Sequence, residues 1–178
     1  MDIALGSDLR AVAPVNLGTA EAWTLEGLPD AERHLREGAV LAREIGRPYL
    51  EVACLPQLGF ASKVHPFATT QARCREAMAL AEHYGWGTEP VIAPALITLA
   101  GSLIWAGEFD EGERWLRRTA RAPQTDTGPD IGLLMHNVSG MLHACQGRLH
   151  SAFEEFSAAE RLQSRLAGSH TLASQMTG

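Results

Sequence analysis

The stretch "EPVIAPALITLAGSLIWAGEFDEGERWLRR" (89–118) predicts the fold of this chain. Residues 91–107 are uncharged and largely apolar, whereas residues 108–118 are rich in charges. Gly107 separates the two halves, and glycine is common where a helix ends. Leu116 follows the small Gly112 by four positions, so the two lie on one face of a helix. The stretch therefore predicts two antiparallel helices that pack closely around small residues.

The same arrangement recurs along the chain with a period near forty residues. Predicted turns are centred on Gly27, Pro66, Gly107 and Gly147. Small residues stand seven positions before these turns, at Ala20, Gly59, Ala100 and Gly140. After the turns, a small residue precedes a large one by four positions in the pairs Ala31 and Leu35, Gly112 and Leu116, and Ala152 and Phe156, with a degenerate pair at Thr70 and Cys74. A single helical hairpin cannot bury its apolar face alone, so these hairpins are expected to stack.

The fold class that we predict is all-α, a tetratricopeptide-like right-handed superhelix of about four antiparallel helix hairpins plus a partial ninth helix. The first helices of the hairpins are expected at 8–26, 48–63, 89–106 and 130–146. The second helices are expected at 29–45, 67–84, 108–122 and 148–167, and the ninth helix near 169. The corresponding units of one domain, 1–178, are approximately 8–46, 47–87, 88–128, 129–168 and a partial 169–178. Because the ninth helix would be left uncovered, we expect a fragment of a larger protein.

Composition excludes several classes of protein. With 46% hydrophobic and 20% charged residues in 178, the chain can bury a core and is not disordered. A net charge of −6 argues against nucleic acid or an anionic membrane as the main partner. The uncharged stretches 91–107 and 131–147 are short for a bilayer and contain polar residues, so no membrane span is expected. Three scattered cysteines and the lack of a signal peptide predict a cytoplasmic protein.

Charges separate by helix type. Residues 90–107 and 131–147 carry none, and 48–62 carry only Glu51, whereas the second helices are densely charged. In two-helix solenoids the first helices line the concave side, so a neutral groove is expected there. Such a groove suits an uncharged small molecule or an apolar protein segment better than an acidic peptide. The alternative is that the first helices are simply sandwiched between their neighbours.

Three segments resemble a known family: "AERHLREGAVLAREIGRPYLEVACLPQLGFAS" (31–62), 89–118 as quoted above, and "GMLHACQGRLHSAFEEFSAAERLQ" (140–163). They resemble the tetratricopeptide-like region of MalT-like bacterial transcriptional regulators of the LuxR family, over about 8–178. The resemblance implies a cytoplasmic sensor segment that couples binding of an inducer or partner to activation of a regulator. The phosphate-loop and helix-turn-helix modules of that family are not found in these residues, so the other domains of the regulator are expected partners and direct contact with nucleic acid is not.

Candidate binding residues are polar or aromatic side chains on the predicted first helices. They are Asn16, Glu21, Tyr49, Gln57, Trp105, His136 and Asn137. Asn and Gln offer both hydrogen-bond donors and acceptors, as a neutral polyol requires, and an aromatic face suits the apolar face of a sugar. Inter-helix packing is the alternative for Trp105, and packing or ligand hydrogen bonding are the alternatives to a metal site for His136.

No cofactor, metal or catalytic set is predicted, and we expect no enzyme. The paired carboxylates Asp110–Glu111 and Glu154–Glu155 are adjacent in sequence and so do not face each other on a helix. Two functions stay open: the sensor and interaction segment of a LuxR-family regulator, and a free-standing tetratricopeptide scaffold that binds a partner protein segment. The expected uncovered end also predicts a homodimer.

Overall fold

The computed structural model of the chain describes residues 2–24, 28–61, 66–121 and 129–176. Its helices are α1 (Asp2–Thr24), α2 (Leu28–Glu44), α3 (Pro48–Ala61), α4 (Pro66–His83), the short 3-10 helix η1 (Pro90–Ile92), α5 (Ala93–Trp105), α6 (Phe109–Arg121), α7 (Pro129–Cys145) and α8 (Leu149–Met176). These described residues contain no strand, which confirms the all-α prediction. The predicted turn at Gly27, the residues just before Pro66 and the loop at 122–127 lie outside them.

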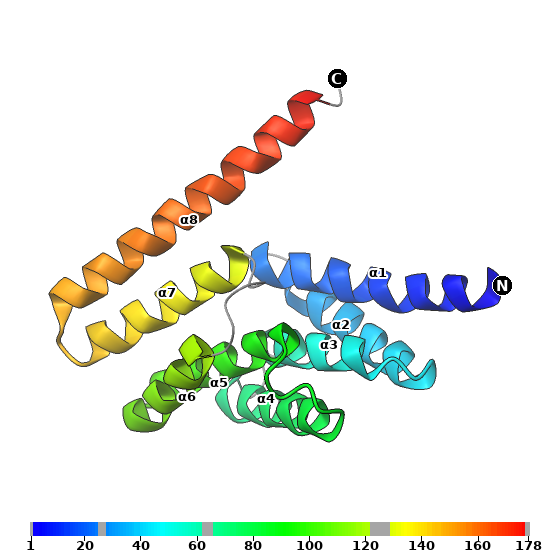
Figure 1. The fold of residues 1–178 in the computed structure, drawn as a ribbon, viewed down its shortest axis with the longest axis horizontal. Coiled ribbons are helices and arrows are strands. Elements are labelled where there is room, and N and C mark those ends of the chain that lie inside the picture. The colour runs from blue at the N-terminus through cyan, green and yellow to red at the C-terminus, as the bar shows by residue number, and fades with distance from the viewer. Residues whose placement is uncertain (1, 25–27, 62–65, 122–128, 177–178) are drawn as a thin grey trace.

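The helices pack as successive pairs. The pairs α1/α2, α3/α4, α5/α6 and α7/α8 each form a hairpin, and α2 also packs on α3 as α4 does on α5. The first helices of the hairpins, α1, α3, α5 and α7, lie next to one another in that order (Figure 1). α7 packs on α5 and contacts α6 only lightly, and α8 leans away from the body of the molecule. The fourth hairpin is therefore joined to the rest mainly through its first helix.

Two of the predicted helix boundaries are wrong. α8 is one continuous helix to Met176, so no ninth helix begins near 169. Gly168 costs a helix only about 1 kcal/mol relative to alanine, and no proline follows it, so the helix continues through this position. α1 begins at Asp2, well before the expected residue 8.

Four glycines with positive φ end helices in the same way. They are Gly46, Gly85, Gly107 and Gly147. At Gly107 the backbone N–H donates to the carbonyl of Ile104 at 3.0 Å, and Glu108 N–H donates to Leu103 at 2.9 Å. The other three make the same pair of bonds, which satisfies carbonyls that the end of a helix leaves unpaired. Because a side chain strains this conformation, glycine sets the place of each turn.

Small residues bring the two helices of each hairpin together. A Cβ added at Gly140 would lie 2.7 Å from the ring of Phe156, and one added at Gly59 would lie 3.1 Å from the Cα of Thr70. In the first hairpin the contact is made by Gly18, whose added Cβ would meet Leu35 at 2.7 Å. The expected residue Ala20 is instead exposed. The contact in the first hairpin thus lies two residues earlier than the pattern predicts.

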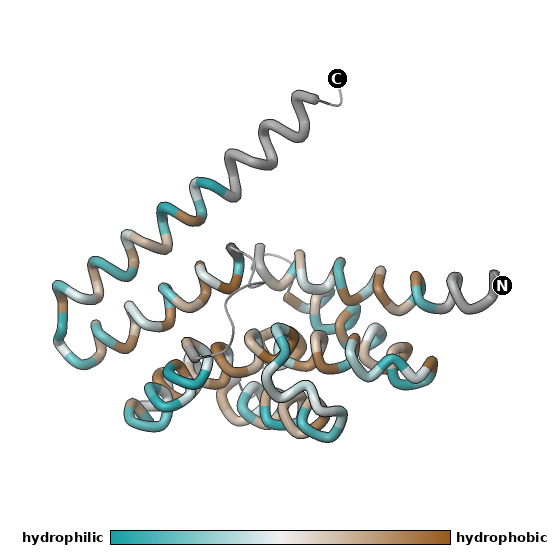
Figure 2. Tube along the Cα trace, in the orientation of Figure 1, coloured by the Kyte–Doolittle hydropathy of each residue, from teal (hydrophilic) through white to brown (hydrophobic). Residues whose placement is uncertain are grey.

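Among the described residues, the hydrophobic core forms three clusters, and each one crosses a boundary between hairpins. The first joins Leu35 and Ala39 of α2 to Cys54 and Leu58 of α3. The second joins α3 and α4 to η1 and α5, and the third joins α5 and α6 to Leu142 of α7. Hydrophobic residues accordingly gather on α3 and α5 at the centre of the molecule (Figure 2). Each hairpin thus buries its apolar face against the next.

Ion pairs connect the second helices to one another and to their neighbours. Arg118 of α6 pairs with Glu82 of α4 at 3.1 Å, and Arg75 of α4 lies 3.9 Å from Glu111 of α6. Arg43 of α2 donates from Nε to Glu51 of α3 at 2.9 Å, and Glu51 is 6% exposed. This bond raises the pKa of the Arg43 guanidinium, because it stabilises the charged form. Several charged side chains of the second helices are thus paired with charges on neighbouring helices.

Candidate functional site

A groove of about 390 Å³ lies between α3, α4, α5 and α7. Twelve residues line it, and none of them is charged: Phe60, Phe67, Thr70, Ile97, Thr98, Gly101, Ser102, Trp105, Leu134, Asn137, Val138 and Met141. We call it the neutral groove. Its volume falls within the range of about 300–1,000 Å³ that is usual for ligand pockets. Most of its lining comes from α3, α5 and α7, the helices that the charge pattern predicts to carry few charges.

The local sequence explains why the groove stays open. Gly101 of α5 faces α7, and a Cβ added there would lie 3.5 Å from Val138. This distance is an ordinary contact, so the missing side chain of Gly101 leaves space between α5 and α7 that larger side chains on either side line. Phe60 lies in the last turn of α3 and Phe67 in the first turn of α4, so these two aromatic rings come from the hairpin that precedes α5. The groove is thus built by three successive hairpins.

Large aromatic side chains form an exposed part of the groove lining. Trp105 is 66% exposed, Phe60 is 51% exposed and Phe67 is 42% exposed. Exposed rings of this size present apolar area to an occupant, and burying such a ring stabilises a complex by about 1.5–3 kcal/mol. An occupant with an apolar surface would therefore gain binding free energy by covering these three rings.

Polar groups in the groove use their donors on the protein's own backbone. Ser102 Oγ donates to the carbonyl of Leu99 at 2.8 Å, and Thr70 Oγ1 donates to that of Gly59 at 2.8 Å. Asn137 Nδ2 donates to the carbonyl of Leu133 at 3.1 Å. A hydroxyl oxygen accepts as well as donates, and an amide oxygen accepts, so Ser102 and Asn137 also offer acceptors to an occupant. The groove is therefore suited to an uncharged molecule that carries hydrogen-bond donors.

The structure places two of the seven candidate residues in the neutral groove. Trp105 and Asn137 both line it, from α5 and α7. Asn16 is exposed on α1, and Gln57 is partly buried on α3 outside the lining. Tyr49 is 47% exposed and packs edge-on against Trp86, with ring centroids 5.3 Å apart.

The other two candidates, Glu21 and His136, each bridge the two helices of one hairpin. Glu21 of α1 is bonded to His34 of α2 at 2.7 Å, and His136 of α7 is bonded to Glu155 of α8 at 2.7 Å. His136 also lines a second hollow of about 260 Å³ between α6, α7 and α8. Each of these two side chains connects the two helices of its hairpin, and neither lines the neutral groove.

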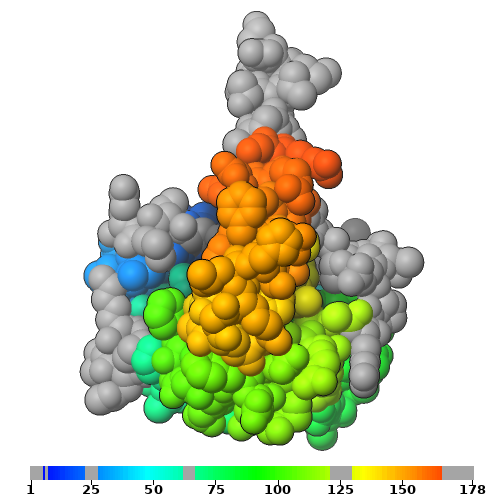
Figure 3. Space-filling model, turned by 90° about the vertical axis from the view of Figure 1, so that its left-hand side faces the viewer, coloured from blue at the N-terminus to red at the C-terminus, as the bar shows by residue number. Residues whose placement is uncertain are grey.

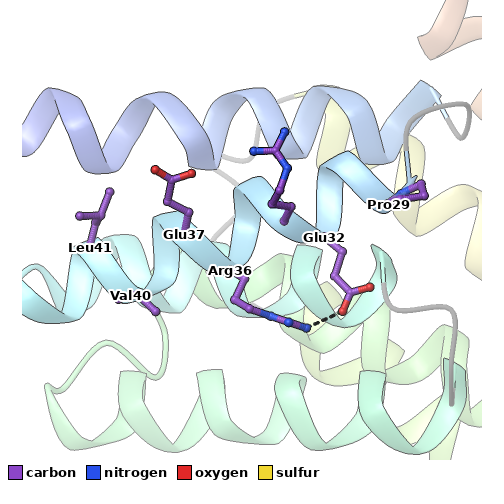
Figure 4. A pocket seen from close by; sticks show the side chains of 7 residues that line it. Pro29, Glu32, Arg36, Glu37, Val40 and Leu41 are labelled. Atoms are coloured by element: carbon purple, nitrogen blue, oxygen red, sulfur yellow. Dashed lines mark hydrogen bonds and ion pairs between the residues drawn. The ribbon is translucent and has the colours of Figure 1, made fainter.

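A third hollow, on α2, is shaped by one helix alone. Its lining runs from Pro29 to Leu41 and includes Glu32 and Arg36, which are paired at 2.6 Å (Figure 4). Val40, in the same lining, is 46% exposed. Since no second element encloses this hollow, it cannot surround a ligand as the neutral groove does.

Within the described residues, His, Cys, Asp and Glu form no group of three that could hold a metal ion. Burial raises the pKa of the Cys54 and Cys74 thiols to about 12, so both are held in the unreactive thiol form. In the same part of the chain, no helix combines the length and the apolar character that crossing a membrane demands.

Most groove residues were missed at the sequence level. Phe60, Phe67, Ile97, Ser102, Leu134 and Met141 belong to uncharged stretches or flank a turn. The lack of charge in 91–107 and 131–147 was the available signal, but it does not show which side of each helix remains uncovered. The candidates were polar or aromatic side chains, so aliphatic lining residues such as Ile97 and Leu134 were not among them.

No protein-family model matches the chain, and no curated protein matches it.

Proposed function

We propose that this chain is a helical-repeat binding module and that the neutral groove binds an uncharged small molecule. The observation that carries the proposal is the lining itself: residues from three successive hairpins, without a charged side chain, enclose about 390 Å³. An ion would lose its hydration there without gaining a partner of opposite charge. A molecule with apolar faces and hydroxyl or amide donors would satisfy both the aromatic rings and the acceptors of Ser102 and Asn137.

The wider role follows from the resemblance to the MalT-like region of LuxR-family regulators. In that setting, this tetratricopeptide-like segment would act as the cytoplasmic sensor, and occupancy of the groove would favour one state of the regulator over another. Such control requires that the ligand bind the two states with different affinities. The adjoining reading frame tests this role: a phosphate-loop module upstream and a helix-turn-helix downstream support it, and a stop codon with neither module refutes it.

A thermal-shift screen of uncharged metabolites tests the groove. A ligand that binds only the folded state, at a concentration one hundred times its Kd, raises the free energy of unfolding by about 2.7 kcal/mol. For a chain of this size that raises Tm by about 5–10 °C. The screen should include sugars, polyols, amides and neutral aromatic compounds.

Variants identify where a binder from this screen acts. Trp105→Ala should weaken binding about tenfold or more, because it removes the most exposed ring of the groove. Tyr84→Ala is the matched control, since Tyr84 is 48% exposed and stacks on Trp86 away from the groove. Equal loss in both variants, or no neutral binder at all, would contradict the proposal. Copurification of a protein segment that Trp105→Ala releases would favour a scaffold for partner proteins instead.

A further inference from the structure

The hollow that His136 lines, of about 260 Å³, lies at the junction of the third and fourth hairpins. We call it the polar hollow, because side chains with hydrogen-bonding groups reach it from three helices: Thr119 of α6, His136 and Ser139 of α7, and Glu155 of α8. Figure 3 shows the beginning of α8, in orange, next to the green surface of the third hairpin. The polar hollow and the neutral groove share no lining residue, so they are separate sites.

The repeat pattern places polar residues in this hollow where earlier hairpins have a filled core. His136 and Ser139 stand four positions and one position before Gly140, the small residue of α7 that contacts α8. The same two positions before Gly59 and before Ala100 are leucines, and all are buried in the core clusters: Leu55, Leu58, Leu96 and Leu99. The fourth hairpin thus has an imidazole and a hydroxyl in place of two buried leucines.

The polar groups of the hollow retain free hydrogen-bond acceptors. His136 Nδ1 lies 2.7 Å from Glu155 Oε2, and an ionised carboxylate only accepts, so the imidazole donates from Nδ1. In its neutral form the ring then leaves Nε2 as an acceptor. Among the described residues, neither Glu155 Oε1 nor Ser139 Oγ has a hydrogen-bond partner. Thr119 Oγ1 donates to the carbonyl of Trp115 at 3.1 Å and can still accept.

These groups favour a cation that donates hydrogen bonds. The lining includes the carboxylate of Glu155 but neither arginine nor lysine, so an anion would meet only like charge. The Glu155 side chain is 31% exposed, and an ion pair in such a partly desolvated place is stronger than one in open water. A metal ion fits less well, because the described residues hold no group of three His, Cys, Asp or Glu side chains.

We propose that the polar hollow binds a small primary amine in its ammonium form. An ammonium group has three N–H donors and no acceptor, which matches the free acceptors of Glu155, His136 and Ser139. Ile131 and Met135 give the hollow apolar walls that the carbon chain of the amine can cover. The volume lies below the range of about 300–1,000 Å³ that is usual for ligand pockets, so the amine carries only a few carbon atoms. This proposal does not depend on the function proposed for the neutral groove.

Titration of the full chain with n-butylammonium, followed by amide NMR chemical shifts, tests the proposal. We expect saturable shifts around residues 131–139 and 155, and binding of uncharged n-butanol at least about tenfold weaker. Glu155→Gln should weaken n-butylammonium binding about tenfold or more, because it removes the charge that pairs with the ammonium. Glu154→Gln is the matched control: it removes the same charge one residue earlier, where the side chain is 65% exposed and outside the lining. This control should bind like the unmodified chain.

A second variant tests the hollow without removing a charge. Ser139→Leu restores the leucine of the corresponding positions Leu58 and Leu99, so it should fill the hollow and abolish binding while the urea midpoint is retained. Far-UV circular dichroism checks that each variant keeps its helices. Unchanged binding by a folded Ser139→Leu would overturn the proposal, as would n-butanol binding as well as the amine. Equal weakening in Glu154→Gln would show attraction by the overall negative charge only, and no saturable binding at tens of millimolar would show that the hollow takes no amine.

Discussion

Replacing Gly18 with alanine should destabilise the chain, although alanine is the better helix former. A Cβ at this position would lie 2.7 Å from Leu35 Cγ and 3.0 Å from both the carbonyl oxygen of Ala31 and the backbone nitrogen of Leu35. Leu35 is fully buried, and backbone atoms of α2 cannot rotate away. The two helices of the first hairpin must therefore move apart, and the core around Leu35 loses contacts.

The magnitude follows from two opposing effects. Overpacking of a well-packed core costs about 1–3 kcal/mol, and two of the three crowded atoms belong to the backbone, which favours the upper part of that range. The gain in helix propensity from glycine to alanine offsets about 1 kcal/mol. The net loss should be about 1–2 kcal/mol in the free energy of unfolding. At a urea dependence of about 1–3 kcal/mol per molar, the midpoint should fall by about 0.5–1 M.

Gly6→Ala provides the matched control in the same helix. Gly6 is exposed, and an added Cβ would meet nothing within 4 Å. Only the propensity effect remains, so this variant should be more stable by up to about 1 kcal/mol. Urea unfolding followed by circular dichroism measures both variants. If Gly18→Ala proved as stable as Gly6→Ala, the close approach of α1 and α2 would be refuted.

Two further predictions concern titrating groups. The Arg47 side chain donates to both carboxylate oxygens of Asp8 at 2.9 Å, and this holds the pKa of Asp8 below its usual 3.8. The pairing therefore stabilises the fold above pH 3.8, and this stabilisation is lost as the pH falls through the lowered pKa of Asp8. Asp8→Asn should accordingly lower the urea midpoint of unfolding at neutral pH. In strong acid the variant and the unmodified chain should have the same midpoint. In thiol titration with an aromatic disulfide reagent at mildly alkaline pH, the exposed Cys145 should react first, while Cys54 and Cys74 should react only on unfolding. Rapid reaction of all three thiols in the folded chain would contradict their burial.

The hairpins could be predicted from sequence because their determinants are local. A helix can end in a positive-φ conformation where the sequence has a glycine, as at Gly107 and Gly147. A spacing of four residues places a pair such as Ala152 and Phe156 on one face of a helix. Both signals lie within a few residues of sequence. In the first hairpin the prediction named Ala20, whereas the helices meet at Gly18, two residues earlier. The continuity of α8 was missed because a glycine lowers helix stability without ending a helix.

The groove was harder to predict because it depends on the relative placement of three hairpins. The uncharged stretches indicated a neutral surface, and Trp105 and Asn137 were named on that basis. Which rings remain exposed, as Phe60 and Phe67 do, is decided by how far α5 and α7 stand from α3 and α4. That separation depends on contacts such as Gly101 with Val138, which join residues far apart in the sequence.

The construction of the groove from three hairpins gives its occupant a mechanical effect. Because Phe60, Trp105 and Met141 belong to different hairpins, any bending of the array alters the separation between the walls. A molecule bound between these walls, as we propose, would oppose that bending and hold the helices at one curvature. Binding at the centre would then change the stiffness and direction of both ends, at a distance from any contact with the molecule itself.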